Sequence, residues 1–148
     1  ARKSGTNSVL DIWASGLDSP IDFGGKIHWR SYKSFLWADL ERELPHYKAI
    51  LLPYRTATQS DVQLMAWSFG TVCLPSSLPG LIENQPPQVD SVSLNDLESW
   101  LTSLATLDRK ETARELGYRG KVAMQQRTSL PKVSRDLILF LEGVRRPL

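Results

Sequence analysis

Cysteine, histidine and long apolar runs are scarce in this sequence of 148 residues, and each scarcity excludes a class of protein. A single cysteine, Cys73, excludes an internal disulfide framework and a cysteine metal cluster. The two histidines, His28 and His46, stand in no cluster with cysteine or carboxylates, so we expect neither a metal nor a cofactor. The chain has no run of about 18 apolar residues, and therefore no predicted transmembrane helix.

An excess of one charge is lacking as well. The sequence has 18 Lys and Arg against 16 Asp and Glu, a net charge of +2, and both signs are scattered along it. It has no basic run and no interleaving of aromatic with basic residues, so we expect no nucleic-acid partner. The length suffices for one domain with a hydrophobic core, and no linker divides the chain, so we predict a single domain over residues 1–148.

Apolar patterns along the chain predict strands and helices in alternation. Short apolar runs predict strands at 8–14, 26–31, 48–53 and 71–74. Apolar stripes at helical spacing predict helices at 34–44, 62–69, 94–107, 108–129 and 131–143. The fourth of these helices is charged, and we expect it to be exposed and to break near Gly117 and Gly120. Because strands alternate with helices, the pattern predicts an α/β fold with a parallel sheet of at least four strands, covered by helices on both faces.

Residues at the helix ends support this assignment. Thr58 with Asp61 three positions later resembles a capping box, and Ser60 is a further cap candidate. Gly70 is a favourable helix stop, and Ser34 can cap the first helix. These signals place one helix between the third and fourth predicted strands.

A polar loop, residues 54–61, joins the third predicted strand to that helix. In an open parallel sheet, ligands bind outside the carboxyl ends of the strands, where this loop lies. The unpaired amides of a first helical turn can hold a phosphate, and Gln59, Ser60 and Asp61 would present those amides. The alternative is that the loop is only a polar connection with a good cap, and spacing alone leaves both interpretations open.

The stretch ILLPYRTATQSDVQLMAWSFGTVCLPSSLPGLIE, residues 50–83, carries a resemblance to a known family. Its pieces are an apolar strand ending in proline, a short loop, a helix ending at glycine, a short strand, and a Pro-Gly loop followed by glutamate. Residues 51–53 end the strand, Gln59 with Ser60 lies in the loop, and Ala66 and Gly70 lie near the end of the helix. Pro79 with Gly80 forms the Pro-Gly loop, and Glu83 is the glutamate that follows. Over about residues 8–107 the chain resembles the C-terminal, nucleotide-sugar-binding domain of retaining GT-B glycosyltransferases of the glycosyl transferases group 1 type.

The resemblance implies a Rossmann-like three-layer domain with a mostly parallel sheet, the C-terminal half of a GT-B fold. It implies donor binding during the transfer of a sugar from a nucleotide-sugar to an acceptor such as a polysaccharide or a lipid-linked glycan. The acceptor-binding half is then absent from this chain, so we expect no catalytic residue here and no activity of the isolated chain. The expected location is the cytoplasm, with peripheral membrane association open for a full-length protein.

Seven residues are donor-binding candidates by the same resemblance: Arg55, Thr58, Gln59, Ser60, Ser77, Gly80 and Glu83. The helix amides at 59–61 would face the phosphates, the 76–81 loop with Glu83 would face the sugar or ribose, and residues 30–33 would lie near the base. Each candidate also has an ordinary structural explanation, such as a surface ion pair for Arg55, a helix start for Glu83 and turns for the others.

Departures from the family pattern keep other functions open. Ala57 and Met65 stand where the family often has two glutamates, and Asp61 replaces the glycine of a Gln-Ser-Gly loop. The carboxylate of Asp61 would repel a diphosphate by roughly 1 kcal/mol at about 4 Å in water. These departures favour the alternative of a degenerate, non-catalytic GT-B-like interaction module. An unrelated α/β module, such as a receiver-like or flavodoxin-like domain, is a second alternative.

Overall fold

The computed structural model describes residues 10–14, 27–31, 36–87, 89 and 91–144. The chain forms two compact units, residues 1–43 and residues 44–148. Each unit contains one pair of strands. The single domain expected over residues 1–148 stays a prediction.

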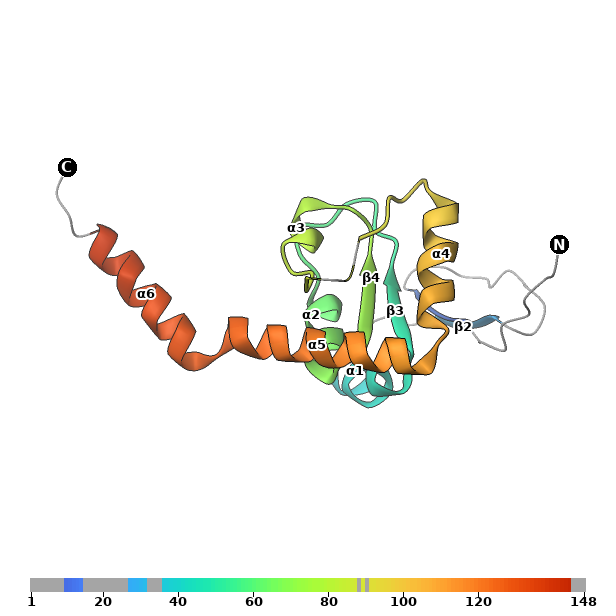
Figure 1. The fold of residues 1–148 in the computed structure, drawn as a ribbon, viewed down its shortest axis with the longest axis horizontal. Helices are drawn as coiled ribbons and strands as arrows, with labels where there is room; N and C mark the ends of the chain where they lie inside the picture. Colours follow the sequence, from blue (N-terminus) through green and yellow to red (C-terminus); the bar gives the residue numbers. More distant parts are fainter. Residues whose placement is uncertain (1–9, 15–26, 32–35, 88, 90, 145–148) are drawn as a thin grey trace. The chain divides into compact units, whose positions relative to one another are not determined.

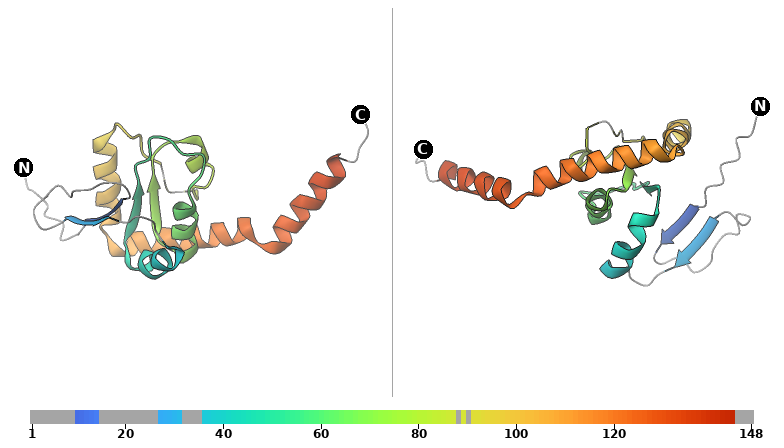
Figure 2. Two further views of the ribbon diagram at one scale, coloured as in Figure 1. Left: turned by 180° about the vertical axis from the view of Figure 1, so that it is seen from behind. Right: turned by 60° about the horizontal axis from the view of Figure 1, so that its bottom comes forward.

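The first unit pairs β1 (Leu10–Ala14) with β2 (Ile27–Ser31). The two strands run parallel, in register from Leu10 opposite Ile27 to Ala14 opposite Ser31 (Figure 2). The helix α1 (Trp37–Glu43) follows them in the chain. The first two predicted strands and the helix predicted within 34–44 are therefore confirmed.

The second unit is built around β3 (Ala49–Leu52), α2 (Asp61–Phe69) and β4 (Val72–Pro75). The two strands are adjacent and parallel, in register from Ala49 opposite Val72 to Leu52 opposite Pro75 (Figure 1). All four residues of β4 are buried, as expected for an apolar strand covered on both faces. The parallel arrangement of strands around a helix is confirmed here.

Within the described residues the strands form two separate sheets, although the sequence predicted one parallel sheet of at least four strands. One sheet pairs β1 with β2, and the other pairs β3 with β4. Beside β4, an isolated parallel bridge joins Ser76 to Val92. Apolar runs predicted where the strands form and that they are parallel, but a run of four or five residues does not determine which strand lies along its other edge.

Helices make up much of the rest of the second unit. They are the 3-10 turn η1 (Leu44–His46), α3 (Pro79–Ile82), α4 (Leu97–Leu107), α5 (Lys110–Thr128) and α6 (Leu130–Val144). α2 and α4 lie on opposite sides of the β3–β4 pair, and α5 packs on α2 and β4 (Figures 1 and 2). The helices predicted between the third and fourth strands, at 94–107 and at 131–143 are confirmed, with ends shifted by a few residues.

The core of the second unit gathers around α2 and β4. Trp67, Val72 and Cys73 have no exposed surface. The later helices contribute Trp100, Leu107, Ala113 and Met124 to the same cluster. Burial raises the pKa of the Cys73 thiol, so this residue is the small core side chain that its apolar strand indicated.

Some apolar residues that the sequence places on helical stripes lie at the surface instead. In the first unit Leu36 and Trp37 are exposed. Among the described side chains of α6, the large apolar residues at the surface include Leu130, Val133, Leu137, Ile138, Leu139 and Phe140. In the part of the chain that the structure describes, no helix has both the length and the apolar character needed to cross a bilayer.

α5 is one continuous helix, so the expected break near Gly117 and Gly120 is wrong. Both glycines are buried where α5 meets α2. A Cβ at Gly117 would overlap the carbonyl oxygen of Gly70, and a Cβ at Gly120 would overlap the ring of Trp67. The two glycines therefore allow the helices to approach closely and do not end α5.

Candidate functional site

The loops that follow β3 and β4 emerge at one edge of the strand pair, because the strands are parallel. We call this the C-terminal edge, residues 53–61 and 76–83. Hydrogen bonds join its two segments: the Ser76 amide donates to Leu52 O at 3.0 Å, and Ser76 Oγ donates to Tyr54 O at 2.7 Å. The first of these segments leads directly into α2, as the sequence predicted for the loop 54–61.

Ser60 is the N-cap of α2. Its Oγ accepts a hydrogen bond from the Gln63 amide at 3.3 Å, so this cap candidate is confirmed and the capping box expected from Thr58 and Asp61 is wrong. The extended backbone of Ser60, with φ −141° and ψ 116°, turns the hydroxyl toward the first turn. The amides of Asp61 and Val62 come before the first amide that donates within the helix, that of Leu64 to Ser60 O, and have no partner within the helix. The exposed carboxylate of Asp61 belongs to the same turn.

Thr58 and Gly80 come into direct contact. A Cβ at Gly80 would overlap the carbonyl oxygen of Thr58, so a residue with a side chain does not fit there without movement. Asn84 Nδ2 donates a hydrogen bond to Gly80 O at 3.3 Å. The absence of a side chain at Gly80 thus lets α3 close against the 53–61 loop.

Gln63 is a residue of this region that the sequence analysis missed. It is fully buried, and its Nε2 donates to Leu81 O and to Gln85 Oε1, each at 2.9 Å. Gln85 Nε2 in turn donates to Cys73 O at 3.0 Å. These bonds tie α2 to α3 and β4, while Gln63 Oε1 is buried with no partner among the described residues. A buried glutamine does not stand out in an apolar pattern, and the position of Gln63 three residues after a serine cap was the available signal.

The remaining donor-binding candidates are exposed. The side chains of Arg55, Gln59 and Glu83 form no ion pair or hydrogen bond with the described residues. Ser77 Oγ accepts a hydrogen bond from Ser91 Oγ at 3.3 Å. The structure therefore brings Thr58 and Gly80 together by packing and leaves Arg55, Gln59 and Glu83 available to a ligand.

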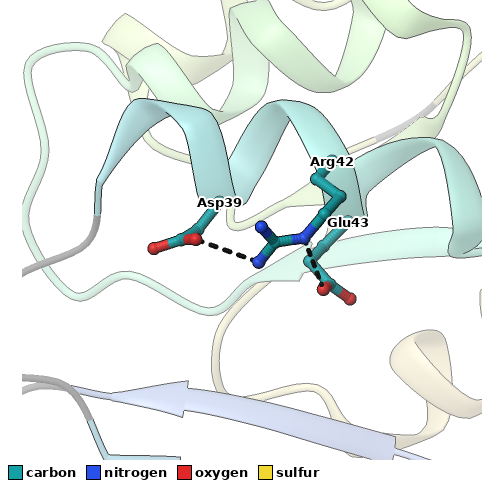
Figure 3. Close-up of polar contacts among 3 residues, drawn as sticks. All are labelled: Asp39, Arg42 and Glu43. Atoms are coloured by element: carbon teal, nitrogen blue, oxygen red, sulfur yellow. Dashed lines mark hydrogen bonds and ion pairs between the residues drawn. The ribbon is translucent and has the colours of Figure 1, made fainter.

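The helix α1 carries an exposed group of charges. Arg42 Nη2 lies 2.9 Å from Asp39 Oδ1, and Arg42 Nε lies 3.4 Å from Glu43 Oε1 (Figure 3). The hydrogen bond to Glu43, followed by that to Asp39, raises the pKa of the Arg42 guanidinium. Ion pairs this exposed stabilise a protein little, and we assign them no chemistry. Among the described residues, no group of three or more His, Cys, Asp or Glu side chains could hold a metal ion.

Several predicted positions fall outside the described residues. They are the cap Ser34 and residues 32 and 33, which the resemblance placed near a base; the side chains of His28 and Arg30 are likewise not described. His46 is described and lies exposed at the end of η1.

A cavity of about 440 Å³ lies at the opposite end of the strand pair. Its lining includes Tyr47 and Lys48, directly before β3, and Gly70 and Thr71, directly before β4. Residues of α5 complete the wall. No motif in the sequence predicted a site there.

Comparison of the chain with protein-family models, curated proteins and solved structures finds no match. The resemblance to GT-B domains therefore stays a prediction from sequence motifs. The candidate sites rest on the residues and geometry of this chain.

Proposed function

We propose that the chain is the donor-binding half of a GT-B glycosyltransferase and that it takes a nucleotide-sugar at the C-terminal edge. In this proposal the second unit belongs to a Rossmann-like, three-layer domain. The observation that carries it is the β3–α2–β4 arrangement, which brings the 53–61 loop, the first turn of α2 and the loop after β4 to one edge. Ligands of open α/β sheets bind at edges of this kind.

The first turn of α2 would receive a phosphate. The amides of Asp61 and Val62 have no acceptor within the helix, and the positive end of the helix lies beside them. The exposed guanidinium of Arg55 would pair with another phosphate oxygen, and the exposed carboxylate of Glu83 would accept hydrogen bonds from sugar or ribose hydroxyls. Transfer to an acceptor would need a second domain, so the role proposed for these residues is donor capture.

A degenerate, non-catalytic interaction module is the second candidate, and the packing of the C-terminal edge favours it. Gly80 is packed against Thr58, and the Gln63 side chain fixes α3 to α2. Ala57 and Met65 supply no carboxylate for a donor. In this interpretation the polar loop is a connection, and Ser60 serves only as a cap.

Calorimetric titration with nucleoside diphosphates separates the two candidates. Asp61→Gly should raise affinity about fivefold, because it removes roughly 1 kcal/mol of repulsion from the phosphate position. Arg55→Ala should lower affinity by a similar factor. Asp96→Asn is the matched control, since it removes a carboxylate at the start of α4, keeps an oxygen for the cap and should leave binding unchanged.

Two outcomes would contradict the proposal. If neither the native chain nor Asp61→Gly binds at millimolar nucleoside diphosphate, the interaction module replaces donor capture. If the chain alone transfers or hydrolyses a nucleotide-sugar with robust turnover, the assignment to half of an enzyme is wrong.

A further inference from the structure

The cavity at the other end of the strand pair offers a site separate from the C-terminal edge. Its volume of about 440 Å³ falls within the range of small-molecule sites, roughly 300 to 1,000 Å³. Its walls are the segment 45–48 that leads into β3, the segment 69–71 at the end of α2, and one face of α5. We call this cavity the basic pocket.

The charged side chains of the lining are positive. Lys110, Arg114 and Lys121 lie on one face of α5, at spacings of four and seven residues, and Lys48 comes from the segment before β3. Among the described residues, no Asp or Glu lines the pocket. Lys48 Nζ lies 3.0 Å from Asp108 Oδ1, whereas Lys110, Arg114 and Lys121 form no ion pair with any described residue.

These unpaired charges contrast with other cations on the same helices. Arg119 pairs with Glu115 one turn earlier in α5, and Lys132 pairs with Asp136 one turn later in α6. The face of α5 toward the pocket has cations without such partners. Like charges that line a cavity repel one another more strongly than like charges on an exposed surface, because water screens them less. An anion from outside the chain would remove this repulsion.

Aromatic side chains share the lining with the cations. Tyr47, Phe69 and Tyr118 contribute to it, and Tyr118 is 67% exposed, so its ring is open to a flat group. Thr71 is buried and its hydroxyl donates to Leu44 O at 2.8 Å, which fixes this part of the wall. Cations beside an open ring suit a ligand that has both an anionic part and a planar part.

We propose that the basic pocket binds a small organic polyphosphate, a ligand with two or more linked phosphate groups and a planar ring. The phosphates would pair with Lys110, Arg114 and Lys121, of which the arginine can contact two oxygens at once, and the ring would lie against Tyr118. A long nucleic acid would need basic surface well beyond the pocket, and the 18 basic residues are nearly balanced by 16 acidic ones along the chain. This inference does not rest on the proposed function, because the pocket and the C-terminal edge lie at opposite ends of the strands.

Titration with ATP and with inorganic tripolyphosphate tests the pocket. The pocket variant combines Lys110→Ala, Arg114→Ala and Lys121→Ala. The matched control combines Arg119→Ala, Arg127→Ala and Arg135→Ala, which remove the same charge from α5 and α6 at positions that do not line the pocket. We expect the native chain to bind both probes, the pocket variant to lose affinity about tenfold or more, and the control to lose about twofold or less. Circular dichroism and thermal melting check that each variant is folded.

Tyr118→Ala separates the ring contact from the phosphate contacts. ATP affinity should fall about fivefold, as expected for the loss of one stacked ring, while tripolyphosphate affinity should not change. Unchanged ATP affinity in this variant would overturn the ring contact.

Several outcomes would contradict the phosphate site itself. It is overturned if the native chain binds neither probe at millimolar concentration, or if the two triple variants lose affinity equally. Loss of tripolyphosphate binding in Arg55→Ala, with binding retained in the pocket variant, would place the phosphate at the C-terminal edge. That result would overturn this inference while supporting donor capture.

Discussion

The two ends of the β3–β4 pair are filled in different ways. At the C-terminal edge, hydrogen bonds from Ser76 and the contact of Gly80 with Thr58 draw the loops together. At the opposite end, a cavity lined by Lys48, Lys110, Arg114 and Lys121 remains beside the contact of Gly117 with Gly70. At each end, a glycine lies against the backbone of another segment: Gly80 against Thr58, and Gly117 against Gly70. The second of these contacts borders the basic pocket. A glycine contact at a strand end is therefore evidence of close packing and not, by itself, of a binding site.

Gly117→Ala should have the largest effect, because it breaks the helix contact at the end with the pocket. The new Cβ would overlap the carbonyl oxygen of Gly70, which belongs to the backbone and cannot rotate away. We expect the free energy of unfolding to fall by about 3 kcal/mol, measured by urea denaturation. Gln125→Ala, at an exposed position of the same helix, should change it by less than about 0.5 kcal/mol. Native stability in Gly117→Ala would show that α5 can move away from α2 freely.

Gly80→Ala applies the same change to the C-terminal edge and should have a smaller effect. The Cβ would overlap the backbone of Thr58, but α3 has only four residues and can shift more easily than α5. We expect a loss of about 2 kcal/mol in the free energy of unfolding, by the same denaturation experiment. Gln59→Ala, in the exposed part of the loop, serves as the control. A loss larger than that of Gly117→Ala would reverse the order of the two ends.

Gly70→Ala tests whether the backbone conformation of this residue, and not the space around it, requires glycine. Gly70 has φ 80° at the C-cap of α2, in the left-handed region, and a Cβ there would make only ordinary contacts. We expect a loss of about 1 to 2 kcal/mol, detected as a lower melting temperature. Gly70→Asn should lose less, because asparagine adopts this conformation more readily than alanine. Equal losses in the two variants would argue against strain as the cause.

Ser60→Ala should have the smallest of these effects. It removes the hydroxyl that accepts from the Gln63 amide, and loss of such a cap lowers stability by about 1 kcal/mol. Ser68→Ala is the control, since the Ser68 hydroxyl donates to Leu64 O within the same helix and caps nothing. Thermal melting compares the two variants. An equal change in both would mean that the first turn of α2 does not need its cap.

Local features of the fold could be predicted from the sequence. The apolar runs around Ile50 and Cys73 predicted two parallel strands, and Gly70 predicted the end of α2. These signals act through neighbouring residues, so no knowledge of distant contacts is needed. The same reasoning failed at Gly117, where a glycine that weakens an isolated helix is required by the backbone of another helix.

The basic pocket could not be predicted in this way. Its lining comes from three segments, 45–48, 69–71 and 110–121, that are far apart in the chain. In the sequence, Lys48 and Lys121 stand among residues of both charges, and only the packing of α5 on α2 brings them to one cavity. The C-terminal edge was predictable because its loop directly follows a strand and precedes a helix.

The rate at which Cys73 is labelled can report how often the second unit opens. Cys73 lies opposite Ile50 in the middle of the strand pair, has no exposed surface, and burial raises the pKa of its thiol. The thiolate is the nucleophile that attacks a thiol reagent, and it must be exposed to do so, so labelling must wait until the strands come apart. Because the sequence has one cysteine, the labelling rate under native conditions counts these openings without any introduced probe.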